Sequence, residues 1–104
     1  MPLTIDFKQL VVKRIRRDPA FGDAILQGAI ECLLEGEVAT GKSMLRDYIN
    51  GTIGFRALSA ATGRHEKSLM RMLSAQGNPQ ASNIFNIIKE VQLQTGTKVT
   101  VQVN

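Results

Sequence analysis

The chain has 104 residues, 43% of them hydrophobic, and a formal net charge of +4. This length predicts one domain, 1–104, and the apolar fraction excludes a disordered chain. A single cysteine, Cys32, excludes an internal disulfide. We expect it to be a small buried apolar residue, because a reactive thiol would need a nearby His or a CxxC partner that the sequence lacks. The sequence has no bilayer-spanning apolar run and no recognisable signal peptide, so we expect a cytoplasmic protein with no membrane partner.

The positive charge lies mainly in the middle of the chain. Residues 1–36 hold five Lys or Arg and five Asp or Glu, residues 37–94 hold seven against four, and residues 95–104 add Lys98. An excess of cations in one block favours an anionic partner for that block. The three ranges also describe the expected organisation, which is an N-terminal helical pair, a central core and a C-terminal strand.

The first expected helix is capped by Thr4 or Asp6 and ends at about Arg17. Cations crowd its last turn, where they interact favourably with the helix dipole. An alternative role for them is a second phosphate contact or a surface for an acidic partner. They are Lys13, Arg14, Arg16 and Arg17.

Asp18 and Pro19 predict the start of a second helix, with Asp at the cap and Pro at the first helical position. This helix extends to about Leu34, and its broad apolar stripe predicts that it is largely buried. Gly28 lies inside it at a cost of about 1 kcal/mol relative to Ala, which indicates close packing.

A third helix is expected over about Val38–Ile49 and is ended by Asn50 and Gly51. Leu45, Tyr48 and Ile49 share its inner face, whereas Lys42, Arg46 and Asp47 are expected to face outward. After a break at Pro79, Ser82 is expected to cap a last helix that extends to about Gln94 and closes the core. The apolar residues of this helix are Ile84, Phe85, Ile87, Ile88, Val91 and Leu93.

Between these helices, residues 55–79 predict two short helices joined by a tight turn. The first covers Phe55–Thr62, Gly63 supplies the left-handed turn residue, and the second covers about 65–74. This is the layout of a helix-turn-helix, whose second helix enters the DNA major groove. The cations and polar groups expected on the outer surface are Arg56, Arg64, His65, Glu66, Lys67, Ser68 and Arg71. The alternative is a plain helical hairpin with a solvated charged face.

Residues 98–103 alternate at period two and are rich in β-branched side chains, which predicts a short strand. A single strand cannot satisfy its own backbone groups, and no second strand is evident in the sequence. We therefore expect it to pair either with its copy in a second subunit or with a strand of a different protein. The remaining alternative is a frayed tail.

Enzymatic chemistry finds little support in the sequence. The one histidine, His65, lies on the helix expected to face DNA. A metal site needs two or more His or Cys ligands at set spacing, whereas this chain has one of each, far apart in the sequence. Residues 36–43, GEVATGKS, match the phosphate-loop pattern literally, but they follow a helix where that loop requires a buried strand. We interpret the match as fortuitous and expect neither a cofactor, a metal nor catalytic residues.

Residues 55–91 resemble the helix-turn-helix of the lambda-repressor/Cro (XRE) class. The residues that carry the resemblance are Leu58 and Ser59, Gly63, Leu69 and Met72, Gly77-Asn78-Pro79, and Ile84 with Ile88. Arg64 and Leu73 depart from the class pattern, which usually has an apolar residue and a Glu at these positions. The resemblance implies an all-α helix-turn-helix bundle, here with two extra N-terminal helices and a short C-terminal strand.

Longer segments, RRDPAF, ECLLEGEVATGKSMLRDYINGTIGF and SLMRMLSAQGNPQASNIF, resemble the HigA-like antidote proteins of bacterial addiction modules. The resemblance implies an antitoxin that binds operator DNA as a homodimer, represses its own operon and neutralises a RelE/ParE-type toxin. By position, His65, Glu66, Lys67, Ser68 and Arg71 would read bases, and Arg56 and Arg64 would contact phosphates. The alternative is an interaction module of the same fold that does not bind DNA sequence-specifically.

Overall fold

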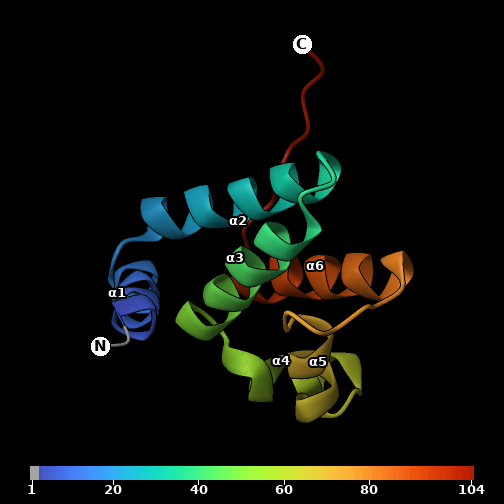
Figure 1. Ribbon diagram of the computed structural model, residues 1–104. Coiled ribbons are helices and arrows are strands. Elements are labelled where there is room, and N and C mark those ends of the chain that lie inside the picture. Colours follow the sequence, from blue (N-terminus) through green and yellow to red (C-terminus); the bar gives the residue numbers. More distant parts are fainter. Residues whose placement is uncertain (1–2) are drawn as a thin grey trace.

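The computed structural model describes residues 3–104, which form six helices (Figure 1). They are α1 (Leu3–Arg17), α2 (Pro19–Leu34), α3 (Val38–Gly51), α4 (Gly54–Thr62), α5 (Glu66–Met72) and α6 (Ala81–Thr95). The all-helical class is therefore confirmed for the described residues. None of their helices combines the length and the apolarity needed to cross a bilayer.

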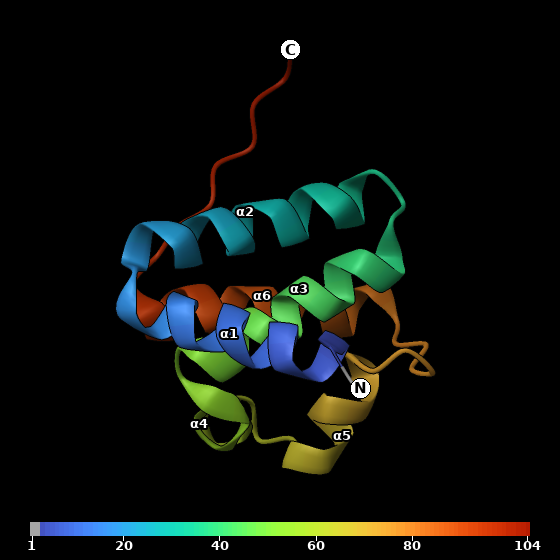
Figure 2. The ribbon, with the colours of Figure 1, turned by 60° about the vertical axis from the view of Figure 1, so that its left-hand side comes forward.

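The helices are arranged so that α4 and α5 lie at one end of the molecule and α2 at the other. Figures 1 and 2 show α3 and α6 between these two ends, and α1 against the side of α3. The most extensive helix contacts are between α2 and α3, while α4 contacts α3, α5 and α6. Helices α3 and α6 thus connect the α4–α5 pair to the rest of the molecule.

One hydrophobic core joins all six helices. The inward positions predicted for α3 are confirmed, since Leu45, Tyr48 and Ile49 are all buried. The prediction for α2 is only partly correct, because Leu34 is exposed and several other members of its apolar stripe are half-buried. The buried core residues are Ile15, Leu26, Ala29, Leu45, Tyr48, Ile49, Phe55, Leu58, Leu69, Leu73, Ile84, Ile87, Ile88 and Val91.

The helix boundaries follow the predicted signals where these are strong. Asp18 caps α2, since its Oδ1 accepts the Phe21 N–H at 3.2 Å, and Pro19 is the first helical residue. Two predicted caps are wrong. Helix α1 begins at Leu3, so Thr4 and Asp6 lie within it, and α6 begins at Ala81 after Gln80, which places Ser82 inside the helix.

The predicted end of α3 at Asn50 and Gly51 is also wrong, because the helix extends through Gly51. Gly51 serves close packing here. A Cβ built on it would lie 2.6 Å from Ile15 Cγ2 and 3.1 Å from the Val12 carbonyl oxygen. The absent side chain allows α1 and α3 to approach each other.

The predicted strand over residues 98–103 does not form in the single chain. Residues 97–104 have no regular secondary structure, and no strand lies beside them within residues 3–104. The physical reason is the one that limits any isolated strand, namely that its backbone groups need a second strand as hydrogen-bond partner. Figure 1 shows this segment leaving the molecule past α2.

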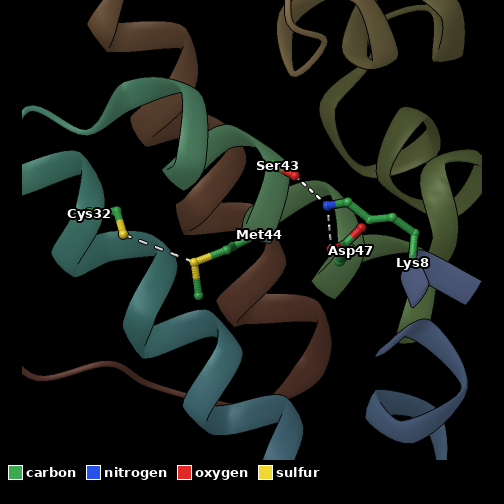
Figure 3. Close-up of polar contacts among 5 residues, drawn as sticks. All are labelled: Lys8, Cys32, Ser43, Met44 and Asp47. Carbon is green, nitrogen blue, oxygen red and sulfur yellow. Dashed lines mark hydrogen bonds and ion pairs between the residues drawn. The ribbon is translucent and has the colours of Figure 1, made fainter. Parts of the chain in front are cut away.

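Two residues predicted to face outward from α3 are buried, namely Lys42 and Asp47, with exposed fractions of 5% and 7%. Asp47 is buried because α1 covers it, and its Oδ2 accepts a hydrogen bond from Lys8 Nζ at 2.8 Å (Figure 3). Lys8 Nζ also donates to Ser43 Oγ, so one cation links α1 to two turns of α3. Cys32 is half-buried, with its Sγ 4.0 Å from Met44 Sδ, which agrees with an apolar role.

The tight contact at Gly51 generates a stability prediction with a matched control. Gly51→Ala should lower the free energy of unfolding by about 1–3 kcal/mol, because its Cβ meets a branched side chain and a backbone oxygen. Gly28→Ala should be neutral or stabilising by up to about 1 kcal/mol, since its Cβ meets the mobile methyl end of Met44 and Ala favours the helix. Urea denaturation measures both. Equal losses in the two variants would contradict this account.

Candidate nucleic-acid interface

The connection between α4 and α5 is a tight turn built around Gly63. Gly63 ends α4 with φ of 73° and ψ of 12°, a left-handed conformation that Gly adopts without steric cost. The Ser59 hydroxyl donates to the Arg64 carbonyl oxygen at 2.5 Å, and the Thr62 hydroxyl accepts the Arg64 N–H at 3.3 Å. Short side chains at the end of α4 therefore satisfy the backbone of the turn and fix the direction in which α5 begins.

Helix α5 has only seven residues, so packing and not intrinsic propensity must hold it in place. Leu69 of α5 and Leu73, the residue directly after this helix, are buried. They join Phe55 and Leu58 of α4 in the core. Burying two such side chains contributes roughly 3–6 kcal/mol before entropic costs. The two leucines thereby fix the rotation of α5 about its axis.

With that face inward, the opposite face of α5 is exposed. It presents His65, Glu66, Lys67, Ser68 and Arg71, five of the seven residues predicted for the site. Met70, which is also exposed, adds an apolar group to the same short helix. The surface offers hydrogen-bond donors, acceptors and cations within two helical turns, which are the groups that read base edges and bind phosphates.

The two remaining predicted residues lie beside this row. Arg56 is exposed on α4, where it is free to meet a phosphate. Arg64 is half-buried, and its Nη2 donates to Asn83 Oδ1 on α6 at 2.8 Å. A guanidinium has five donors, so one bond to Asn83 leaves others available for a phosphate. No sequence pattern indicated Asn83, which joins the turn to the beginning of α6.

The loop that follows α5 is held by Lys42 from α3. Lys42 Nζ donates to the carbonyl oxygen of Ser74 at 3.0 Å and to that of Gly77 at 2.7 Å. Both carbonyl groups lie beyond Leu73, the residue that ends α5, and the ammonium supplies them with a donor inside the fold. Sequence reasoning placed Lys42 in solvent, because the carbonyl groups that receive it lie more than thirty residues further along the chain.

This position of Lys42 also bears on the phosphate-loop match at residues 36–43. A functional loop would aim its lysine at bound phosphate, whereas the Lys42 ammonium lies inside the fold on two carbonyl oxygens. Residues 38–43 belong to α3, and helix α2 precedes them. The geometry agrees with a fortuitous match. Among the described residues no group of three or more His, Cys, Asp or Glu is arranged to hold a metal ion.

A second set of cations lies between α1 and α3, in a hollow lined in part by Lys8, Lys13, Arg16 and Arg46. Two of them already have partners in the fold. Lys8 pairs with Asp47, and Arg16 Nη2 donates to the Asn50 carbonyl oxygen at 2.9 Å. Of the four cations predicted to crowd the last turn of α1, Arg16 therefore has a structural partner, and this contact favours a structural role for it over a phosphate contact.

Comparison of the chain with family models, with curated proteins and with solved structures gave no match.

The Lys42 contact predicts that its loss will destabilise the loop that follows α5. In Lys42→Met the carbonyl groups of Ser74 and Gly77 lose their shared donor, which should cost about 1–3 kcal/mol of unfolding free energy. The Gly77 N–H, which donates to the Ser74 carbonyl oxygen at 3.1 Å, should exchange faster with deuterium. Lys67→Met is the control, because Lys67 lies on α5 and its side chain is exposed. Unchanged exchange of the Gly77 amide in Lys42→Met would show that the contact does not hold this loop.

Proposed function

We propose that the chain is a helix-turn-helix antitoxin that binds operator DNA, represses its own operon as a homodimer and neutralises a RelE/ParE-type toxin. In this proposal α4 and α5 are the two helices of the motif, and α5 enters the major groove. The observation that carries the DNA-binding part is the row of polar and cationic side chains on α5. The buried Leu69 and Leu73 turn this row to solvent.

Affinity and specificity would come from different side chains. Arg56 and Arg64 flank α5 and would neutralise phosphates, which supplies a salt-dependent, sequence-independent attraction. His65, Lys67, Ser68 and Arg71 would reach base edges, and Arg71 is suited to the two acceptors of guanine. Glu66 would accept from cytosine or repel a phosphate, depending on its exact position in the groove.

The toxin partner comes from the family resemblance alone. The segments RRDPAF, ECLLEGEVATGKSMLRDYINGTIGF and SLMRMLSAQGNPQASNIF carry it, and they cover all of α3, most of α5 and the two ends of α2. Such modules encode the toxin beside the antitoxin, so the neighbouring gene's product is the partner to test.

Co-expression with that gene product should yield a complex that survives purification and restores growth of cells that express the toxin. Growth arrest that continues despite equal expression of the two chains would reject the toxin-neutralising part of the proposal. It would not contradict the proposed DNA binding.

A protein-interaction module of the same fold, without sequence-specific DNA binding, is the second candidate. The exposed carboxylate of Glu66 in the first turn of α5 favours it, because a carboxylate at the reading position repels the phosphate backbone. The two functions differ in salt dependence. Sequence-specific binding to the promoter should survive competitor DNA at physiological salt, whereas nonspecific attraction should disappear.

Substitution of Arg71 tests the proposed base contact. In a gel-shift titration against the chain's own promoter, Arg71→Ala should weaken binding by about 1–3 kcal/mol, which is roughly 5- to 150-fold, because the guanidinium pairs with guanine. Lys89→Ala is the control, since Lys89 is an exposed cation on α6 outside the α4–α5 pair. Equal affinities of Arg71→Ala and the wild type would remove Arg71 from the interface.

A further inference from the structure

The segment that follows α6 is first fixed to the fold and then leaves it. Gly96 ends α6, and Thr97 Oγ1 lies 3.5 Å from Asp23 Oδ1 on α2. The Val99 N–H donates to Gln92 Oε1 at 2.7 Å, and the Val99 side chain packs against the core. Beyond this point the apolar side chains are unprotected, with Val101 71% exposed and Val103 93% exposed.

The bond made by Val99 identifies which edge of this segment is free. In an extended strand, neighbouring residues direct their backbone N–H and C=O groups toward opposite edges. Since the Val99 N–H is directed toward α6, the backbone groups of Thr100 and Gln102 would point to the other edge when the segment is extended. No strand lies beside that edge within residues 3–104. An unpaired edge of this kind is a template for another strand.

We propose that residues 98–104 pair in antiparallel register with the same segment of a second copy of the chain, with Val101 on the two-fold axis. This deepens the proposed function, on which it rests only for the assumption of a dimer. Figures 1 and 2 show the segment leaving the molecule at the end opposite α4 and α5, so pairing leaves the candidate DNA surface uncovered.

The register follows from symmetry and from the free edge. Two identical antiparallel strands related by a two-fold axis must have a residue opposite its own copy. With Val101 at this position, Thr100 lies opposite Gln102 of the second copy, and these residues exchange the backbone hydrogen bonds of the free edge. This register also pairs every residue from 98 to 104. Thr97 lies outside the pairing, because its hydroxyl contacts Asp23.

The side chains are compatible with this self-pairing. On one face Val99 lies opposite Val103 of the second copy, and Val101 lies opposite itself, which gives three β-branched pairs in a row. On the other face Thr100 meets Gln102, and Lys98 meets Asn104, so no like charges face each other. Val103 of the second copy would reach the hollow lined in part by Val99 and the exposed Leu93. A second copy therefore covers apolar groups that the single chain leaves in water.

The first test uses proline, which removes one backbone donor. Analytical ultracentrifugation of the full chain from about 1 μM to about 1 mM, the range of weak interfaces, should show a monomer–dimer equilibrium. Gln102→Pro should shift the wild-type dimer to monomer, because the Gln102 N–H bonds the second copy. Val103→Pro is the matched control. The Val103 N–H points to the outer edge, where Pro is tolerated, so this variant should remain dimeric.

The second test fixes the register. In a Cys32→Ser background, Val101→Cys should form a disulfide-linked dimer under mild oxidation, because opposite residues of a non-hydrogen-bonded pair have Cα atoms about 4.5 Å apart. Thr100→Cys should crosslink far less, since it lies opposite Gln102 and not opposite itself.

A wild-type chain that stays monomeric would overturn the proposal and favour a strand of a different protein as the partner. A Gln102→Pro dimer as stable as the wild type would overturn it in favour of a helical interface. Neither experiment contains DNA, so their failure is distinguishable from failure of the proposed operator binding.

Discussion

The loop that follows the candidate helix α5 depends on one buried cation. Lys42 extends from α3, the helix most enclosed by the fold, to the carbonyl oxygens of Ser74 and Gly77 in the loop that follows α5. A buried ammonium is costly unless its donors are satisfied, and two backbone acceptors meet most of that requirement. A seven-residue helix cannot fix its own position. The contact therefore joins α3 to the loop that follows the helix proposed to meet DNA.

Much of the fold was predictable because residues close in sequence determine where several helices begin and end. Pro19 behind a capping Asp starts α2, and Gly63 ends α4, since both residues determine backbone conformation from within a few positions. The wrong prediction at Gly51 has a different origin. The same residue type that ends helices also permits close helix contacts, and only the position of Ile15 shows which role applies. Helical period likewise could not show that α1 covers Asp47.

The exposed row of the candidate site was predictable for the same local reason. Leu69 and Leu73 mark one face of α5, so Lys67 and Arg71 had to lie on another. The supports of that row were not predictable. Lys42 reaches the loop after α5 from more than thirty residues away, and Arg64 is drawn toward α6 by Asn83. A sequence pattern gives the face of a helix, whereas the partners of a buried polar group depend on the tertiary structure.

The two surfaces proposed to bind partners lie at opposite ends of the structure. The polar face of α5 lies at one end, and the segment beyond Val99 leaves at the other (Figure 1). The first surface is polar and costs little when solvated, so its exposure is stable without a ligand. The second combines exposed valines with unpaired backbone groups, which is the feature that isolated strands cannot satisfy internally. The physical demand for a partner is therefore stronger at the C-terminal segment than at α5, although Lys67 and Arg71 of α5 are suited to an anionic ligand.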